Sequence, residues 1–181
     1  MTTSDGRCEQ EIKTRIGMAK AAFNKRHELL SKNLCIALKK RMVKSLVWSV
    51  ALYASETWTL SQEDIKRLQA FEMWVWRRME KVSWRDKKTN EEVLEAIGEK
   101  RSLMDTICNR KKNWIGHIIR GDSLMKDVIE GRMIGKRPPG RKRYGMLREL
   151  YEGSYATMKR RAEERSVCSN WLPETCQIAE H

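Results

Sequence analysis

The stretch SQEDIKRLQAFEMWVWRRMEKV, residues 61–82, decides the fold of this chain. Its apolar residues recur every three or four positions, which places them on one face of an α-helix; they are Ile65, Leu68, Phe71, Val75, Met79 and Val82. Ser61 and Asp64 have the spacing of a capping box, with Asp in the usual place of Glu. The stretch therefore predicts an amphipathic helix that begins just after Ser61 and packs against other helices.

Helical periodicity continues on both sides of this stretch. Further helices are expected, the last of them only weakly, near residues 9–31, 34–54, 89–98, 102–121 and 144–165. Thr89 and Glu92 form a second capping box, and Gly98 is placed to end that helix. No segment alternates strictly enough to predict a strand. The expected fold class is all-α, an irregular bundle of about five to seven helices with a basic Gly/Pro linker and a loosely ordered C-terminal tail.

The composition points to a nucleic-acid partner. The 181 residues include 37 Lys and Arg against 24 Asp and Glu, a formal net charge of +13. Leu, Ile, Val and Phe make up about one fifth of the chain, so a modest core is expected. A strongly basic chain attracts polyanions, and the longest uncharged apolar stretch, residues 45–55, is too short to cross a bilayer. Nucleic acid is therefore favoured over a membrane.

The positive charge is concentrated in two regions. Residues 1–60 carry +6 and residues 132–165 carry +7, whereas residues 61–100 are neutral. The lysines of the first two helices are interpreted as ordinary solvated surface: Lys13, Lys20, Lys39, Lys40 and Lys44. The segment GRMIGKRPPGRKR, residues 131–143, is expected to be an exposed arm because its Pro and Gly residues disfavour regular structure. Its candidate phosphate contacts are Lys136, Arg137, Arg141, Lys142 and Arg143, with a nuclear localisation signal or a solvated loop as alternatives.

Tryptophan is frequent, with seven residues in the chain. Trp48 and Trp114 lie on or beside apolar stripes and are expected in the core. Trp74 and Trp76 flank Val75 and cannot both face that core, so one of them is a candidate for contact with a partner or ligand. Aromatic rings beside basic residues can stack on bases. The neighbouring candidates for nucleic-acid binding are Arg77, Arg78 and Arg85.

No complete catalytic constellation is found. The six aspartates include no adjacent pair, so the carboxylate cluster that holds two metal ions in a polymerase is missing. Cys168, Cys176 and His181 could supply three zinc ligands, but unpaired thiols in a loose tail are the favoured interpretation. Five cysteines without a CxxC pair argue against a disulfide framework. With no apolar signal segment at the N-terminus, the chain is expected to be intracellular, nuclear or cytoplasmic.

Several strings occur together in order: DGRC (5–8) before EIKTRIGMAKAAFNK, VWSVALYASETWTL (47–60), FEMWVWRRMEKVSWRDKKTNEEVL (71–94), NWIGHIIRGDSLMKDVIEGR (113–132), GKRPPGRKR (135–143) and LPETCQIAEH (172–181). Together they resemble the C-terminal region of LINE-type non-LTR retrotransposon reverse transcriptases, closest to the RTE-like group. The resemblance covers nearly the whole chain. It departs at Tyr53-Ala54-Ser55, where the family commonly has a Gly after the Tyr. The resemblance implies this organisation: a palm-exit remnant (1–8), a helical thumb-like domain (9–131), a basic linker (132–143) and a C-terminal helical segment with a tail (144–181).

The resemblance implies an enzyme parent, an RNA-directed DNA polymerase, but a non-catalytic fragment. The fingers, the palm and the palm's Mg²⁺ site are missing, so no catalytic residue and no cofactor are expected in this chain. The implied partners are RNA and DNA, as an RNA–DNA hybrid, together with the missing fingers and palm. In WIGHIIR (114–120), His117 and Arg120 are candidate phosphate or base contacts, although a packing role is the favoured interpretation of His117.

The expected function is non-catalytic binding of template–primer nucleic acid through basic residues. Such binding would follow the shape and backbone of the duplex more than its sequence. Two alternatives remain open. One is a helical protein-interaction module with an exposed apolar face, on the 42–54 helix or at Trp74 and Trp76. The other is a decayed remnant of a retrotransposon without a selected function.

Overall fold

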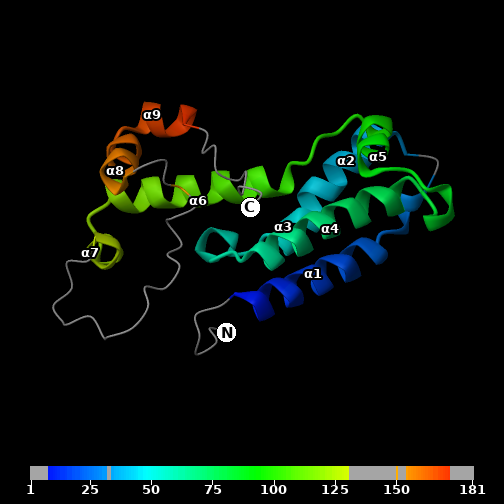
Figure 1. The fold of residues 1–181 in the computed structure, drawn as a ribbon, viewed down its shortest axis with the longest axis horizontal. Helices are drawn as coiled ribbons and strands as arrows, with labels where there is room; N and C mark the ends of the chain where they lie inside the picture. The colour runs from blue at the N-terminus through cyan, green and yellow to red at the C-terminus, as the bar shows by residue number, and fades with distance from the viewer. Residues whose placement is uncertain (1–7, 32–33, 131–149, 151–153, 172–181) are drawn as a thin grey trace. The chain divides into compact units, whose positions relative to one another are not determined.

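The computed structural model describes residues 8–31, 34–130, 150 and 154–171. All regular structure in these ranges is helical, which confirms the all-α fold class. The α-helices are α1 (Glu9–Asn24), α2 (Ile36–Met42), α3 (Trp48–Ala51), α4 (Gln62–Met79), α5 (Asn90–Ile97), α6 (Leu103–Arg120), α7 (Leu124–Glu130), α8 (Tyr155–Glu163) and α9 (Arg165–Asn170) (Figure 1). Shorter turns lie between them: the 3-10 turns η1 (His27–Leu30), η3 (Ser55–Thr57) and η4 (Trp84–Asp86), and the π-helical turn η2 (Val43–Val47).

The chain divides into two compact units. Unit 1 comprises residues 1–54 and 60–105, and unit 2 comprises residues 55–59 and 106–181. The division falls inside α6, and therefore inside the region 9–131 that was expected to form one helical domain. The expected boundaries at 131/132 and 143/144 lie outside the described residues.

Helix α4 is the centre of unit 1. The predicted stripe is buried at Ile65, Leu68, Phe71 and Val75. Trp76 is also fully buried, so the buried face is wider than one stripe. Helices α1 and α5 and turn η1 contact α4, and α1 also packs on α3 and η2. The most regular amphipathic segment of the sequence thus becomes the helix on which the unit is assembled.

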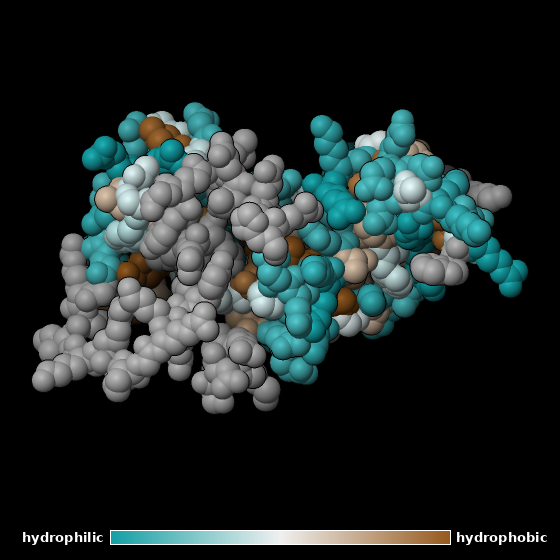
Figure 2. All heavy atoms as spheres, in the orientation of Figure 1, coloured by the Kyte–Doolittle hydropathy of each residue, from teal (hydrophilic) through white to brown (hydrophobic). Residues whose placement is uncertain are grey.

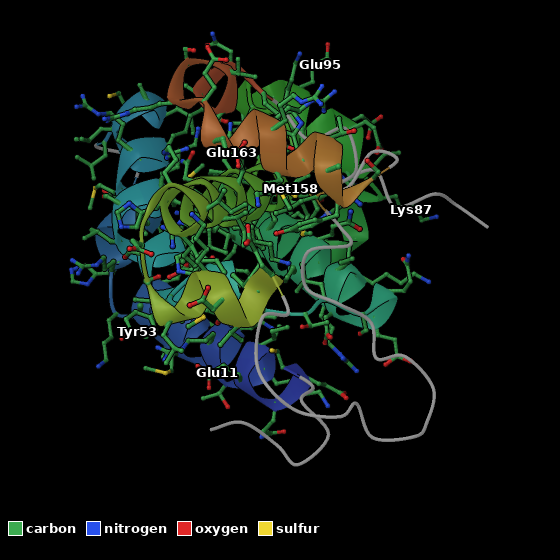
Figure 3. The ribbon with its side chains drawn as sticks, turned by 90° about the vertical axis from the view of Figure 1, so that its left-hand side faces the viewer. Glu11, Tyr53, Lys87, Glu95, Met158 and Glu163 are labelled. Carbon is green, nitrogen blue, oxygen red and sulfur yellow. The ribbon has the colours of Figure 1, made fainter. Side chains whose placement is uncertain are left out.

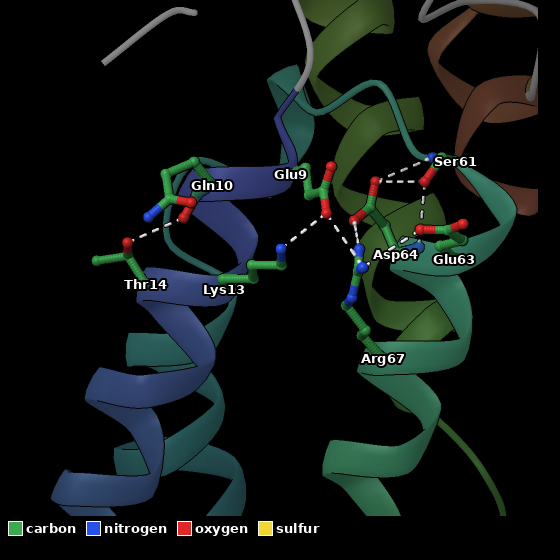
Figure 4. A network of polar contacts seen from close by, with 8 residues as sticks. All are labelled: Glu9, Gln10, Lys13, Thr14, Ser61, Glu63, Asp64 and Arg67. Carbon is green, nitrogen blue, oxygen red and sulfur yellow. Dashed lines mark hydrogen bonds and ion pairs between the residues drawn. The ribbon is translucent and has the colours of Figure 1, made fainter.

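The start of α4 is held by the predicted capping box and by an ionic network with α1 (Figure 4). The Asp64 backbone N–H donates to Ser61 Oγ at 3.2 Å, and the Ser61 N–H donates to Asp64 Oδ2 at 3.3 Å. Arg67 contacts Asp64 at 3.0 Å and Glu9 of α1 at 3.1 Å. The hydrogen bond and charge of Lys13, followed by the charge of Arg67, lower the pKa of Glu9. The first turns of α1 and α4 are therefore joined by opposite charges.

The helix expected near residues 34–54 forms as α2, η2 and α3 in direct succession. One of its lysines, Lys39, differs from the solvated surface expected of it, and two others have partners. Lys39 is buried, Lys40 Nζ donates to the Gly98 carbonyl at 3.0 Å, and Lys44 pairs with Glu99 at 3.0 Å. Gly98 ends α5 with φ of 66°, as its position predicted. Lys40 and Lys44 therefore attach the second helical segment to the end of α5.

The start of α6 is capped by a residue far away in the sequence. Glu72, in the middle of α4, accepts the backbone N–H groups of Ser102 at 2.9 Å and Leu103 at 3.2 Å. Its side chain is almost completely buried, and burial is the main cause that raises the pKa of its carboxyl. The Trp76 indole beside it opposes this only slightly, and its N–H forms no hydrogen bond of good geometry.

Unit 2 has its own small core. The buried members are Ile115, Ile119, Leu150, Met158, Ala162 and Trp171. Trp114 packs partly buried against them, in keeping with its expected core position, and Trp48 is buried in unit 1. Helix α9 occupies residues 165–170, where an irregular chain was expected beyond residue 165. Lys112 is buried, and its Nζ donates to the Trp171 carbonyl at 2.6 Å, which secures the end of α9 to α6.

The cysteines in the described residues are of two kinds. Cys8, Cys35 and Cys168 are free thiols. Cys108 in α6 is disulfide-bonded, although a single bridged cysteine does not amount to the disulfide framework that the sequence argued against. Cys168 lies buried in α9, whereas Cys176 and His181, the other two considered as zinc ligands, lie outside the described residues.

Candidate nucleic-acid interface

The structure places the sequence-predicted binding residues in three groups. Arg77 and Arg78 lie in the last turn of α4, and Arg85 lies in η4 shortly after it, so these three belong to unit 1. His117 and Arg120 lie on α6 in unit 2. The remaining five, Lys136, Arg137, Arg141, Lys142 and Arg143, lie outside the described residues. Unit 1 therefore offers the best-defined candidate surface.

This surface continues into the α4–α5 connection, residues 80–89. Residues 77–88 contain six basic and two acidic residues. Four cations of the connection are exposed and have no carboxylate partner in the described ranges: Lys81, Arg85, Lys87 and Lys88. Lys87 projects away from the helices (Figure 3), and hydrophilic side chains dominate the visible surface at the α5 end of the unit (Figure 2). An unpaired cluster of this sign is suited to phosphate oxygens.

Arg77 supports this connection from within the protein. Its Nη2 donates to the Lys88 carbonyl at 2.8 Å and to Asn90 Oδ1 at 2.9 Å, and its Nε also points to Asn90 Oδ1. These bonds join the last turn of α4 to the first turn of α5. The side chain is half-buried, and its guanidinium is occupied inside the unit. Arg77 is thus placed as a positioning residue, and direct contact with nucleic acid stays a prediction.

Two lysines of the connection adopt a left-handed backbone. Lys81 has φ of 56° and Lys87 has φ of 47°. Lys81 follows α4 in an arrangement that usually contains Gly: the Val82 N–H donates to the Arg77 carbonyl at 2.9 Å, across the end of the helix. A left-handed residue with a Cβ costs about 1 kcal/mol. The sequence thus keeps a charged side chain at two positions where Gly would be favoured by the backbone.

The two neighbouring tryptophans, Trp74 and Trp76, differ in burial. Trp76 is completely buried, whereas Trp74 is half-buried. Two cations lie beside the Trp74 ring: Lys20 Nζ is 5.2 Å from its centroid, and Arg78 Cζ is 5.5 Å away. Lys20 belongs to α1, so periodicity within one helix could not reveal this association. Among the predicted candidates that the structure describes, Arg78 is therefore the one whose charge lies beside an aromatic ring.

The two candidates in unit 2 have different surroundings. The His117 side chain is exposed, so it is accessible rather than packed. Arg120 Nη1 donates to the Ala162 carbonyl of α8 and thereby joins α6 to α8. Its guanidinium also lies over Gly116, where an added Cβ would be 2.9 Å from Nη1. Arg120 therefore has an evident structural contact, and its contact with nucleic acid stays a prediction.

No group of three or more His, Cys, Asp or Glu side chains in the described ranges is arranged to hold a metal ion. None of the helices there combines the length and the apolar character needed to cross a membrane.

In comparisons with known proteins, no family model, curated protein or solved structure matches this chain. The resemblance to LINE-type reverse transcriptases therefore depends on the sequence strings quoted above.

Proposed function

We propose that this chain binds nucleic acid without catalysing a reaction, in the manner of the thumb and linker of a LINE-type retrotransposon reverse transcriptase. The proposal joins the motif resemblance to the charge of the chain. RNA and DNA, in the form of an RNA–DNA hybrid, are the proposed partners. The fingers and palm of a parent polymerase would supply the Mg²⁺ site and the catalytic aspartates, and no residue of this chain is given a catalytic role.

The observation that carries this proposal is the exposed, unpaired charge of the α4–α5 connection. Some basic side chains of unit 1 have intramolecular partners, as Lys13, Lys40 and Lys44 do. Other exposed cations are scattered over the unit, whereas the connection places four of them within eight residues. These four cations have no carboxylate partner among the described residues. Each phosphate bound by such a cation releases counterions, which makes the binding favourable at low salt.

The arrangement favours contact with the backbone of the nucleic acid over reading of its sequence. Long, solvated Lys and Arg side chains on a short connection can follow phosphates but offer no fixed pattern of donors and acceptors for base edges. Arg77 bonds to the Lys88 carbonyl and to Asn90, so it holds the backbone at the α5 end of the connection from which these side chains extend. Affinity is therefore expected to depend on charge density and duplex shape, with little preference among sequences.

The proposal is tested by fluorescence anisotropy of a labelled RNA–DNA hybrid across a salt series. One variant replaces Lys81, Arg85, Lys87 and Lys88 with Ala. A matched control removes the same amount of charge elsewhere in unit 1, by replacing Lys13, Arg41, Lys66 and Lys100 with Ala. We expect the first variant to bind more weakly, with a slope of log affinity against log salt lower by about one for each phosphate that is no longer bound.

The control variant distinguishes binding at the α4–α5 connection from attraction of the nucleic acid by the net charge of the chain. If both variants lose affinity equally, net charge alone attracts the nucleic acid and the α4–α5 connection is no binding site. If the wild-type chain does not bind the hybrid even at low salt, the proposed function is wrong. A third variant with Ala at the five basic positions of residues 135–143 measures the contribution of the linker in the same assay.

Protein interaction is a second candidate, favoured by α7. Leu124, Met125 and Val128 of this helix are exposed, Leu124 to 74%. The places first expected for an apolar docking face are less suitable, because Val43, Val47 and Trp76 are buried. A Leu124→Ser, Val128→Ser variant that changes the oligomeric state in analytical ultracentrifugation would favour self-association. A cooperative thermal transition of the wild-type chain would argue against a decayed, partly unfolded remnant.

A further inference from the structure

Trp74 is rigidly held yet incompletely covered. Its ring meets the edge of Phe23 at a centroid distance of 5.4 Å and lies nearly parallel to Phe71, at 6.4 Å and an interplanar angle of 17°. These contacts from α1 and α4 fix the plane of the indole. The side chain is nevertheless only half-buried. A ring whose orientation is set in advance loses little entropy when a second flat group stacks on it.

The two cations beside the ring are available for another partner. Lys20 and Arg78 lie within 5.2 and 5.5 Å of the ring centroid. Neither has a carboxylate partner among the described residues. Arg78 is exposed, and the unpaired cation Lys81 follows it closely in the chain, just past the end of α4. Positive charge that borders an aromatic ring is the arrangement that binds single-stranded nucleic acid, where bases stack and phosphates are neutralised.

Another aromatic–cation pair in unit 1 differs from the Trp74 pair because its cation is bonded to a carboxylate. Tyr53 is 61% exposed and has the Arg15 guanidinium 4.4 Å from its ring centroid. Arg15, however, donates to Glu11 Oε1 at 2.7 Å, so its charge is already neutralised. A carboxylate at this place repels phosphate. The Tyr53 pair therefore serves as an internal control for the Trp74 pair.

We propose that Trp74, with Lys20 and Arg78, is a stacking site for an unpaired base of single-stranded RNA or DNA. The base lies against the uncovered part of the indole, and the two cations move from the ring to the flanking phosphates. This inference rests on the proposed function, since it assigns a ligand to part of the same charged surface. It goes beyond that function because a base paired inside a duplex cannot present its face to Trp74.

The test compares two single strands that have equal charge. The probes are fluorescein-labelled oligo(dT) and an abasic oligonucleotide of the same length and phosphate number, each titrated by anisotropy. We expect the wild-type chain to bind oligo(dT) about tenfold more tightly than the abasic strand. Trp74→Leu should remove that preference while leaving the salt dependence unchanged. Trp74→Phe should keep part of it, and the control Tyr53→Leu should keep all of it.

Failure of the stacking site is distinguishable from failure of the proposed function. Equal affinity of the wild-type chain for the two strands overturns the stacking site without any variant. If that binding still weakens with salt and with the loss of the four cations, the proposed function stands. If neither strand nor the hybrid binds, the proposed function is wrong and the stacking site with it. Thermal unfolding of each variant shows whether it folds. If Trp74→Leu does not fold, Trp74→Phe, which fills most of the same space, is used to test whether the preference for oligo(dT) depends on the size of the ring.

Discussion

The carboxylate of Glu72 accepts the backbone N–H of Leu103 at 3.2 Å, across 31 positions of sequence. This bond, together with that from Ser102, satisfies N–H groups that a helix start leaves without partners inside the helix. A carboxylate at a helix N-terminus is also favoured by the helix dipole. The centre of α4 thereby decides where α6 begins within unit 1.

Glu72→Ala is expected to destabilise the fold substantially. The substitution leaves the Leu103 N–H buried without a partner, which costs about 1–3 kcal/mol of unfolding free energy. Glu72→Gln keeps an acceptor at the same place and should cost much less. Urea unfolding followed by circular dichroism measures both. Equal unfolding free energies for the Ala variant and the wild type would show that the bond does not stabilise the fold.

The pH dependence of stability should differ between the wild type and the Glu72→Gln variant. Burial raises the pKa of Glu72 above its ordinary value of 4.5. Between that value and the raised pKa, the native state holds more protons than the unfolded state, so the stability contribution of Glu72 falls as pH rises. The wild type should therefore lose stability relative to Glu72→Gln from about pH 4.5 upward, until the raised pKa is passed. Unfolding curves of both proteins at several pH values test this, and parallel pH profiles would contradict it.

Lys81→Gly and Lys87→Gly should each stabilise the fold while weakening nucleic-acid binding. Both lysines have positive φ, and Gly relieves the steric cost, which gives up to about 1 kcal/mol. Each substitution also removes a cation from the proposed interface. Lys88→Gly is the control, since it removes the same charge at a residue without a positive φ, and it should not stabilise the fold. Thermal unfolding and the anisotropy assay give the two results separately. Unchanged affinity would remove these lysines from the interface.

Arg77→Lys should reduce both stability and binding although the charge is kept. A Lys ammonium cannot reproduce the paired bonds of the guanidinium with the Lys88 carbonyl and Asn90, so a loss of about 1 kcal/mol is expected. Arg85→Lys is the control: the Arg85 side chain makes no hydrogen bond or ring contact among the described residues, so stability should stay unchanged. A double-mutant cycle with Asn90→Ala isolates the coupling. If Arg77→Lys keeps full stability and affinity, Arg77 is a simple phosphate contact and not a positioning residue.

Gly116→Ala should destabilise unit 2, and Cys168→Ala should rescue it. A Cβ at position 116 would lie 2.8 Å from Cys168 Sγ, so α9 has to move away from α6. Overpacking of this kind typically costs about 1–3 kcal/mol. Without the sulfur atom, the remaining close neighbour of the added methyl group is Arg120 Nη1 at 2.9 Å, at the far end of a flexible side chain that can shift, so most of the loss should be recovered. The helix also gains the higher propensity of Ala over Gly. Thermal unfolding of the two single variants and the double variant tests this, and additive losses would refute the close approach as the cause.

Local rules predicted much of the secondary structure of unit 1. The capping boxes of α4 and α5 and the Gly98 end are formed as their spacing predicted. Such signals are reliable because donor, acceptor and backbone conformation lie within a few residues. Helices α7 and α9 were not predicted, since each is short and too few residues contribute to a periodic pattern.

The candidate site was predictable only in part. The charge of residues 77–88 and the need for Trp74 or Trp76 to leave the core followed from the sequence. The choice between the two rings did not, because it depends on distant partners: Trp76 packs on Trp48 of α3, and Trp74 meets Phe23 of α1. The intramolecular bonds of Arg77 could not be predicted either, since a charged side chain carries no local sign of the carbonyl that it will meet.

By itself, the sequence determined the all-α class, the positions of the capped helices and the excess of positive charge. These depend on side chains that lie near one another along the chain. Tertiary structure alone decided that Glu72 caps α6, that Lys20 of α1 lies beside Trp74 of α4, and that the compact units divide within α6. Each of these arises when distant segments pack together, because packing brings groups within bonding distance that no spacing along the chain relates.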